Sequence, residues 1–175
     1  MSAEHMPPLL AFVAASGTGK TTLLEQLIPL LRARGLRLAV IKHTHHDFDV
    51  DQPGKDSYRM RAAGAQQVML ASRRRWALLT EHADGREEPR LAELVQALDR
   101  RALDLILVEG FKHETVRKIE LHRPALGKAA LFPADPQIIA VACDAPPAEG
   151  SAIPLLDLNN PEEVAAFVLR TIGRQ

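Results

Sequence analysis

Apolar residues occur along this chain in two patterns: short continuous runs, and runs that recur every three or four positions. Continuous apolar runs are typical of buried parallel strands, and recurring ones of amphipathic helices. The predicted strands of the main sheet cover residues 9–14, 36–41, 105–109, 117–123, 137–142 and 153–156. The predicted helices cover residues 20–34, 55–63, 89–101 and a last segment that begins at Asn160. This order predicts an α/β fold with a mainly parallel central sheet.

Three of the predicted strands have features of their own. Residues 66–72 and 75–81 flank Arg73 and Arg74 and are followed by a turn at 83–86, which predicts an inserted antiparallel strand pair. Residues 117–123 alternate polar and apolar side chains, which predicts a half-exposed strand.

A glycine-rich loop joins the first predicted strand to the first predicted helix. Its residues are Ser16, Gly17, Thr18, Gly19, Lys20, Thr21 and Thr22. A strand, a tight glycine turn and a helix N-terminus form the phosphate-binding P-loop of NTPases. Ala14 replaces the first glycine of the usual motif, a change that a strand end tolerates because it needs only a small residue there. The sequence therefore predicts a three-layer P-loop NTPase fold.

Each part of this loop has an expected task. Gly17 and Gly19 let the backbone approach a polyphosphate, and the helix N-terminus attracts the anion. Lys20 is expected to reach the β- and γ-phosphates, and the Thr21 hydroxyl to bind Mg²⁺.

The buried strand at residues 105–109 begins after one acid and ends on another. Asp104 opens the strand, at the sheet edge opposite the phosphates, whereas Glu109 closes it on the phosphate side. We therefore expect Glu109 to lie near Mg²⁺ and, with Lys20, to act in phosphoryl transfer. Gly110 follows Glu109 and would allow a close backbone approach to the ligand or an awkward turn.

The loop after the second strand is the most chemically varied segment of the chain. It contains His43, His45, His46 and three aspartates, Asp47, Asp49 and Asp51. Because ligands bind beyond the carboxyl ends of parallel strands, we expect a substrate or switch loop that gives Mg²⁺ an acidic ligand. Asp49 is the expected metal ligand, and His43 and Asp47 are expected to face the nucleotide or a second ligand. A transition-metal site and a solvated polar loop are the alternatives.

Two further residues are candidates for ligand binding. Arg59 lies on a basic predicted helix that would hold an anionic ligand, although a solvated helix face explains the charge equally well. Asp144 follows the strand at 137–142, where GTP-binding proteins place an aspartate that reads the guanine N1–H and 2-amino group. The usual Asn-Lys-x-Asp string is absent, since Val141-Ala142-Cys143-Asp144 stands there.

Composition narrows the class of protein. The 175 residues fit a single domain, with residues 1–6 as an extension ahead of the first strand. Lysine plus arginine equals aspartate plus glutamate, at 22 each, so nucleic acid is not an expected partner. No apolar run approaches the roughly 20 residues of a membrane span. The one cysteine, Cys143, precludes a disulfide framework within the chain and suits a cytoplasmic protein.

Four motifs taken together resemble the MobB family, the molybdopterin-guanine dinucleotide biosynthesis adaptor proteins. They are the P-loop, Ile41-Lys42-His43 with residues 46–51, residues 53–59 with 63–65, and Leu107-Val108-Glu109-Gly110-Phe111-Lys112. Their order and spacing cover nearly the whole chain. The P-loop alone is unspecific, but the combination is much more specific.

The resemblance implies a GTP-binding protein with weak GTPase activity that acts beside MobA, the guanylyltransferase that attaches GMP to molybdopterin. It also implies a homodimer in which the inserted strands take part. Its cofactors would be GTP and Mg²⁺, and residues 43–51 would face the nucleotide or a pterin.

Two other functions fit the residues: an ATP-dependent small-molecule kinase, and a metal chaperone that uses the histidines under nucleotide control.

Overall fold

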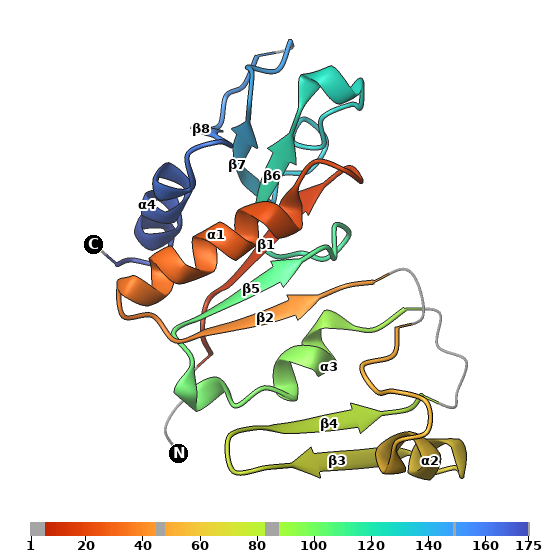
Figure 1. Cartoon of the computed structure of the whole chain (residues 1–175). Helices are drawn as coiled ribbons and strands as arrows, with labels where there is room; N and C mark the ends of the chain where they lie inside the picture. The colour runs from red at the N-terminus through yellow and green to blue at the C-terminus, as the bar shows by residue number, and fades with distance from the viewer. Residues whose placement is uncertain (1–5, 45–47, 83–87, 149, 175) are drawn as a thin grey trace. The chain divides into compact units, whose positions relative to one another are not determined.

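The computed structural model describes residues 6–44, 48–82, 88–148 and 150–174 (Figure 1). It divides into two compact units. One unit, here called the sheet unit, comprises Met1–His43 and Leu91–Gln175. The other, here called the hairpin unit, comprises Thr44–Arg90. Each unit is described by itself, and the expectation of one domain over residues 1–175 stays a prediction.

The sheet unit is built on a six-stranded sheet with the order β2-β5-β1-β6-β7-β8. Every pair of neighbouring strands in it is parallel. The strands are β1 (Leu9–Ala14), β2 (Leu38–Lys42), β5 (Leu105–Glu109), β6 (Lys118–His122), β7 (Ile138–Cys143) and β8 (Leu155–Asp157). Because they all point the same way, the loops after them gather at one edge of the sheet.

Helices cover both faces of this sheet, as the apolar character of its strands requires. Leu105 and Leu107 of β5 belong to a core cluster with α1 (Lys20–Ala33) and α4 (Pro161–Thr171). Ile106 and Val108 belong to a second cluster, with Leu91 and Val95 of α3 (Leu91–Gln96). Successive side chains of a strand point to opposite faces, so β5 contributes to both cores. These three layers confirm the predicted fold class.

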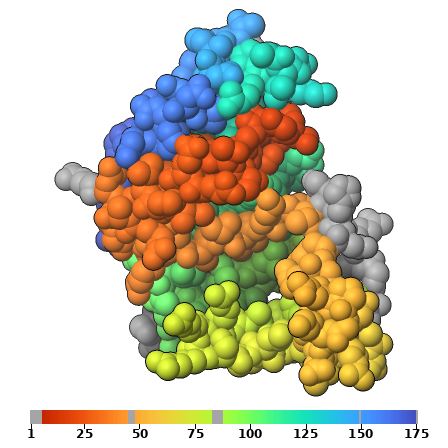
Figure 2. All heavy atoms as spheres, viewed as in Figure 1, coloured from red at the N-terminus to blue at the C-terminus, as the bar shows by residue number. Residues whose placement is uncertain are grey.

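Helices α1 and α4, the longer helices of the sheet unit, lie side by side on one face of the sheet (Figure 2). The Asn160 side chain caps α4 by accepting a hydrogen bond from the Glu163 N–H. The predicted helix at 89–101 is shorter than expected. It consists of α3 and, after a break, a 3₁₀ turn η1 (Arg100–Ala102). A second such turn, η2 (Pro124–Leu126), follows β6.

The prediction that β6 is half-exposed is wrong, because all five of its residues are buried. Two of its polar side chains, Lys118 and Glu120, have partners in the segment that follows. Lys118 Nζ lies 2.7 Å from Asp135 Oδ2. Glu120 accepts hydrogen bonds of 2.8 Å from the backbone N–H groups of Leu131 and Phe132. Paired charges can be buried, so alternating polarity did not indicate exposure here.

The hairpin unit contains the predicted antiparallel strand pair, which is confirmed. Its elements are α2 (Asp56–Ala62), β3 (Gln67–Ala71) and β4 (Trp76–Thr80). Arg61 ties the unit together, because its guanidinium lies 2.7 Å from Asp49 Oδ1 and 2.6 Å from Glu81 Oε1. In the described parts of both units, no helix has the length and apolar character needed to cross a membrane.

Asp104 lies just before β5, at the sheet edge opposite Glu109. Its carboxylate accepts hydrogen bonds from the Nε and backbone N–H of Arg37, both 2.9 Å long, and lies 3.2 Å from Arg174 Nη2. The hydrogen bonds from Arg37 lower the pKa of Asp104 from 3.8 to about 2. Its role is therefore structural.

We predict that Asp104→Asn lowers the Tm at neutral pH. Because the pKa of Asp104 is lower in the folded protein, its stabilising effect is present above about pH 4 and lost as the pH falls toward about 2. Thermal unfolding followed by circular dichroism should show the wild-type and variant Tm values converging over that range. Glu162→Gln, which removes the exposed 3.5 Å pair with Arg34, should change the Tm much less. A Tm gap that stays constant down to pH 2 would contradict the assignment.

Candidate nucleotide-binding site

The loop between β1 and α1 has the conformation of a phosphate cradle. Gly17 and Gly19 have φ values of 82° and 98°, in the region that favours glycine. The buried Thr18 side chain closes the loop by donating a 2.8 Å hydrogen bond to the Ala15 carbonyl. Gly19 is the N-cap of α1 and offers no side-chain cap. The first N–H groups of the helix are thus left for a ligand to satisfy.

The remaining P-loop residues differ in exposure. Ser16, Thr21 and Thr22 are exposed, whereas Lys20 is half-buried, with Nζ 3.4 Å from the Ala14 carbonyl oxygen. Burial lowers the pKa of Lys20, the nearby Glu109 raises it and Lys42 lowers it. An ammonium group that burial has partly desolvated interacts strongly with an anion such as a phosphate.

Glu109 connects the end of β5 to the start of α1. Its Oε1 accepts a 2.9 Å hydrogen bond from the Thr21 hydroxyl, and its side chain is 11% exposed. Lys42, the last residue of β2, places Nζ 3.2 Å from Glu109 Oε2 and 3.2 Å from Thr21 Oγ1. The structure thus brings together two predicted site residues, Thr21 and Glu109, with Lys42, which was not predicted to be part of the site.

Gly110 is required by a contact within the chain. Its φ is 97°, and a Cβ there would lie 3.0 Å from the Cβ of His43. The imidazole of His43 stacks on Phe111, with ring centroids 4.7 Å apart. The expected close approach at Gly110 is therefore to His43. A role for Gly110 or His43 toward a nucleotide stays a prediction.

Asp144 is linked to the P-loop through a residue that the sequence did not single out. Arg123, which follows β6, donates a 2.6 Å hydrogen bond from Nη1 to Asp144 Oδ2. Its Nε donates a second hydrogen bond, of 3.1 Å, to the backbone carbonyl of Thr18. Arg123 follows the carboxyl end of β6, and Asp144 follows that of β7. The P-loop likewise follows the carboxyl end of β1. The position of Arg123 after a parallel strand was therefore the signal in the sequence that could have identified it.

The remaining predicted residues are Asp47, Asp49 and Arg59, which belong to the sequence segment 44–90. Asp49 Oδ1 accepts hydrogen bonds from the Asp51 N–H (2.9 Å) and from Arg61 (2.7 Å), and these lower the pKa of Asp49. Arg59 is 75% exposed and lies 3.8 Å from Asp56. Asp47 lies outside the described residues. The expected roles of all three toward Mg²⁺ or a ligand stay predictions.

A transition-metal site has no support among the described side chains. No group of three or more His, Cys, Asp or Glu residues there is arranged to hold a metal ion. His45 and His46, on which that alternative depended, lie outside the described residues.

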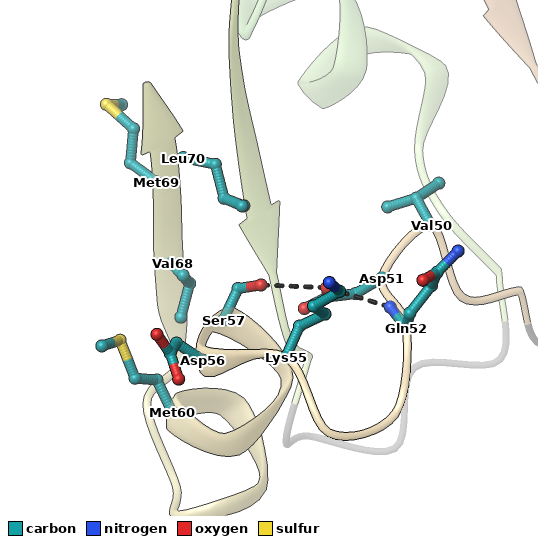
Figure 3. A pocket seen from close by; sticks show the side chains of 10 residues that line it. All are labelled: Val50, Asp51, Gln52, Lys55, Asp56, Ser57, Met60, Val68, Met69 and Leu70. Carbon is teal, nitrogen blue, oxygen red and sulfur yellow. Dashed lines mark hydrogen bonds between the residues drawn. The ribbon is translucent and has the colours of Figure 1, made fainter. Parts of the chain in front are cut away.

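The hairpin unit contains a pocket of about 560 Å³ between α2, β3 and the loop before α2 (Figure 3). Its apolar wall includes Met60 and Met69, which are 57% and 61% exposed. On the polar side, the Ser57 hydroxyl donates a 2.9 Å hydrogen bond to Asp51 Oδ1. This pocket is thus lined partly by exposed methionines.

Comparison with known proteins gives one consistent family. The family model "MobB: Molybdopterin guanine dinucleotide synthesis protein B" matches residues 9–144. The "Molybdopterin-guanine dinucleotide biosynthesis adapter protein" of Escherichia coli K12 is 53% identical over 176 residues, covering 100% of this chain and 99% of that protein. The protein of the same name from Haemophilus influenzae is 47% identical, covering 92% of this chain and 87% of that one.

A solved structure agrees with these matches. The crystal structure described as molybdopterin-guanine biosynthesis protein B (mobB) superposes with a TM-score of 0.72 at 27% identity. It covers 93% of this chain and 99% of that one.

Proposed function

The chain belongs to the MobB family, and from that premise we propose that it is a cytoplasmic, GTP-binding adaptor in molybdopterin-guanine dinucleotide biosynthesis. The observation that supports the nucleotide site best is the 2.9 Å hydrogen bond between Thr21 and Glu109 beside Lys20. It joins the two segments that P-loop proteins use for phosphate and metal. The proposed pathway rests on the names of the relatives, which are adapter proteins of molybdopterin-guanine dinucleotide biosynthesis. The proposed nucleotide ligand is supported by the geometry of the P-loop and Glu109.

The residues of this site fit a magnesium ion. The Thr21 hydroxyl and the Glu109 carboxylate are hard oxygen ligands within hydrogen-bond distance of each other, and Mg²⁺ prefers such ligands. Mg²⁺ usually takes one or two protein ligands and completes its shell with water and substrate phosphates. When bound, it would neutralise charge on the β- and γ-phosphates of the nucleotide.

Lys20, Gly17 and Gly19 are assigned to the phosphates. The glycine backbone leaves room for the anion, and the Lys20 ammonium neutralises charge that develops during phosphoryl transfer.

Hydrolysis is proposed to be slow. Among the described residues, the groups in contact with Glu109 are the Thr21 hydroxyl and the Lys42 ammonium, which position and neutralise charge but do not orient an attacking water. A partner of the guanylyltransferase (MobA) type, with molybdopterin, would complete the assembly. A purified chain that alone reached the GTPase rate of its complex with the guanylyltransferase would contradict this part of the proposal.

We predict that GTP binds in a Mg²⁺-dependent manner and more tightly than ATP, and that Lys20→Ala weakens GTP binding at least about tenfold. This factor corresponds to the loss of one charge-assisted hydrogen bond. Isothermal titration calorimetry with GTP, GDP and ATP, in the presence of Mg²⁺ or EDTA, measures these affinities. Arg32→Ala, which removes a charge from the last turn of the same helix, should leave affinity unchanged. ATP binding equal to or tighter than GTP binding would favour the kinase alternative instead.

Guanine selectivity is assigned to Asp144, whose carboxylate would accept hydrogen bonds from the guanine N1–H and 2-amino group. We predict that Asp144→Asn lowers GTP affinity about tenfold or more and improves binding of xanthosine triphosphate, whose 2-oxygen matches an amide donor. Competition against a fluorescent GTP analogue measures both. Arg123→Gln is the matched control, because it breaks the same ion pair but keeps the carboxylate. If both variants lost affinity for GTP and for ATP to the same extent, Asp144 would act only through Arg123 on the P-loop.

The hairpin is proposed to form the homodimer contact. Met69 pairs with Leu78 and Ala71 with Trp76, so Met69, Leu78 and Trp76 share one face of the strand pair. These three side chains are 61%, 44% and 65% exposed. Adjacent exposed apolar side chains of this size are typical of protein–protein contacts.

We predict that Leu78→Lys converts a dimer into a monomer, because a charge would be buried against the apolar face of the second copy. Light scattering after size-exclusion chromatography reports the mass. Arg74→Ala, in the turn between the strands, should leave the dimer intact. An unchanged dimer in Leu78→Lys with unaltered circular dichroism would rule out this face.

A further inference from the structure

Lys42 is held beside Glu109 by the register of the sheet. It is the last residue of β2, and it lies directly opposite Glu109 in the parallel pairing of β2 with β5. Its side chain is 50% exposed, whereas that of Glu109 is 11% exposed. The ammonium therefore reaches a largely buried carboxylate while half of the Lys42 side chain stays open to solvent.

The contacts of Lys42 form a closed ring of three groups. Its Nζ lies 3.2 Å from Glu109 Oε2 and donates a 3.2 Å hydrogen bond to Thr21 Oγ1. The Thr21 hydroxyl in turn donates a 2.9 Å hydrogen bond to Glu109 Oε1. A hydroxyl has one proton and two lone pairs, so it can serve both partners at once. Each of the two oxygen ligands assigned to Mg²⁺ is thus occupied by the Lys42 cation.

Two cations cannot share these ligands at full strength. A divalent ion held by Thr21 and Glu109 would need the lone pairs that these oxygens give to Lys42, and it would repel an ammonium at hydrogen-bond distance from them. Among the described residues, the Lys42 side chain is 50% exposed and that of Glu109 only 11%, so the ammonium has room to leave.

We infer that Lys42 is a tethered counter-cation of the metal site: it neutralises Glu109 in the metal-free protein and is displaced when Mg²⁺ binds with the nucleotide. This inference rests on the proposed function. Lys42 is a positioning residue, because it keeps Thr21 and Glu109 together before the metal arrives. It also sets the Mg²⁺ concentration that nucleotide binding requires, because the metal must compete with it.

The test is a Mg²⁺ titration at a fixed, sub-saturating concentration of a fluorescent GTP analogue, read by fluorescence anisotropy. We expect Lys42→Met to reach half-maximal binding at a Mg²⁺ concentration at least about threefold lower than wild type, since a competing charge at a partly exposed site is removed. Lys42→Arg, which keeps the charge, should remain close to wild type.

The matched control is Arg32→Met, which removes one positive charge from α1. It lies 11 residues after Thr21, about 16 Å along the helix axis and beyond the screening length at physiological salt. It should leave the Mg²⁺ requirement unchanged. An equal shift in Arg32→Met and Lys42→Met would overturn the inference, because net charge would then explain both.

Nucleotide binding in EDTA supplies a second readout. If Lys42 served the phosphates instead, Lys42→Met would lose affinity for the analogue in EDTA and would need more Mg²⁺, not less. That result, or an unchanged Mg²⁺ requirement in a variant with native circular dichroism, would overturn the inference. Failure of the proposed function is distinguishable, because wild type itself would then show no Mg²⁺-dependent binding.

Discussion

The hydrogen bond between Thr21 and Glu109 is the interaction on which the candidate site depends. It joins the first turn of α1 to the end of β5, two segments 88 residues apart in sequence. The parallel order β5-β1 makes this contact possible, because it brings the end of β5 to the same sheet edge as the P-loop. The apolar cores on both faces of the sheet fix that order. Packing thus determines where the two oxygen ligands meet.

Glu109 sets an electrostatic requirement for this sheet edge. A largely buried carboxylate is costly unless it is paired, and in this structure Lys42 and the Thr21 hydroxyl pair with it while Lys20 lies close by. A site that accepts a magnesium ion must carry negative charge, and the protein must tolerate that charge without the ion. A lysine on the neighbouring strand meets both needs, because it binds Glu109 tightly enough to stabilise it and remains able to leave.

Much of this architecture could be predicted from the sequence, and the failures have physical reasons. The P-loop, Glu109 and the antiparallel pair follow from local patterns, since each depends on neighbouring residues. Burial of Lys118 and Glu120 could not be predicted, because their partners lie about ten or more residues away in an irregular segment. The role of Lys42 depends on the register of β2 against β5, which no local pattern encodes. Arg123 was missed for the same reason, as its two partners come from different strand ends.

A crystal structure of the full chain with Mg²⁺ and a non-hydrolysable GTP analogue tests the central claim most directly. The account predicts Mg²⁺ about 2.1 Å from Thr21 Oγ1 and facing Glu109, with Lys20 Nζ on the β- or γ-phosphate and Lys42 Nζ withdrawn from both metal ligands. A nucleotide bound away from the P-loop would contradict it. So would a Lys42 ammonium that still bridges Thr21 and Glu109 while the metal is bound elsewhere.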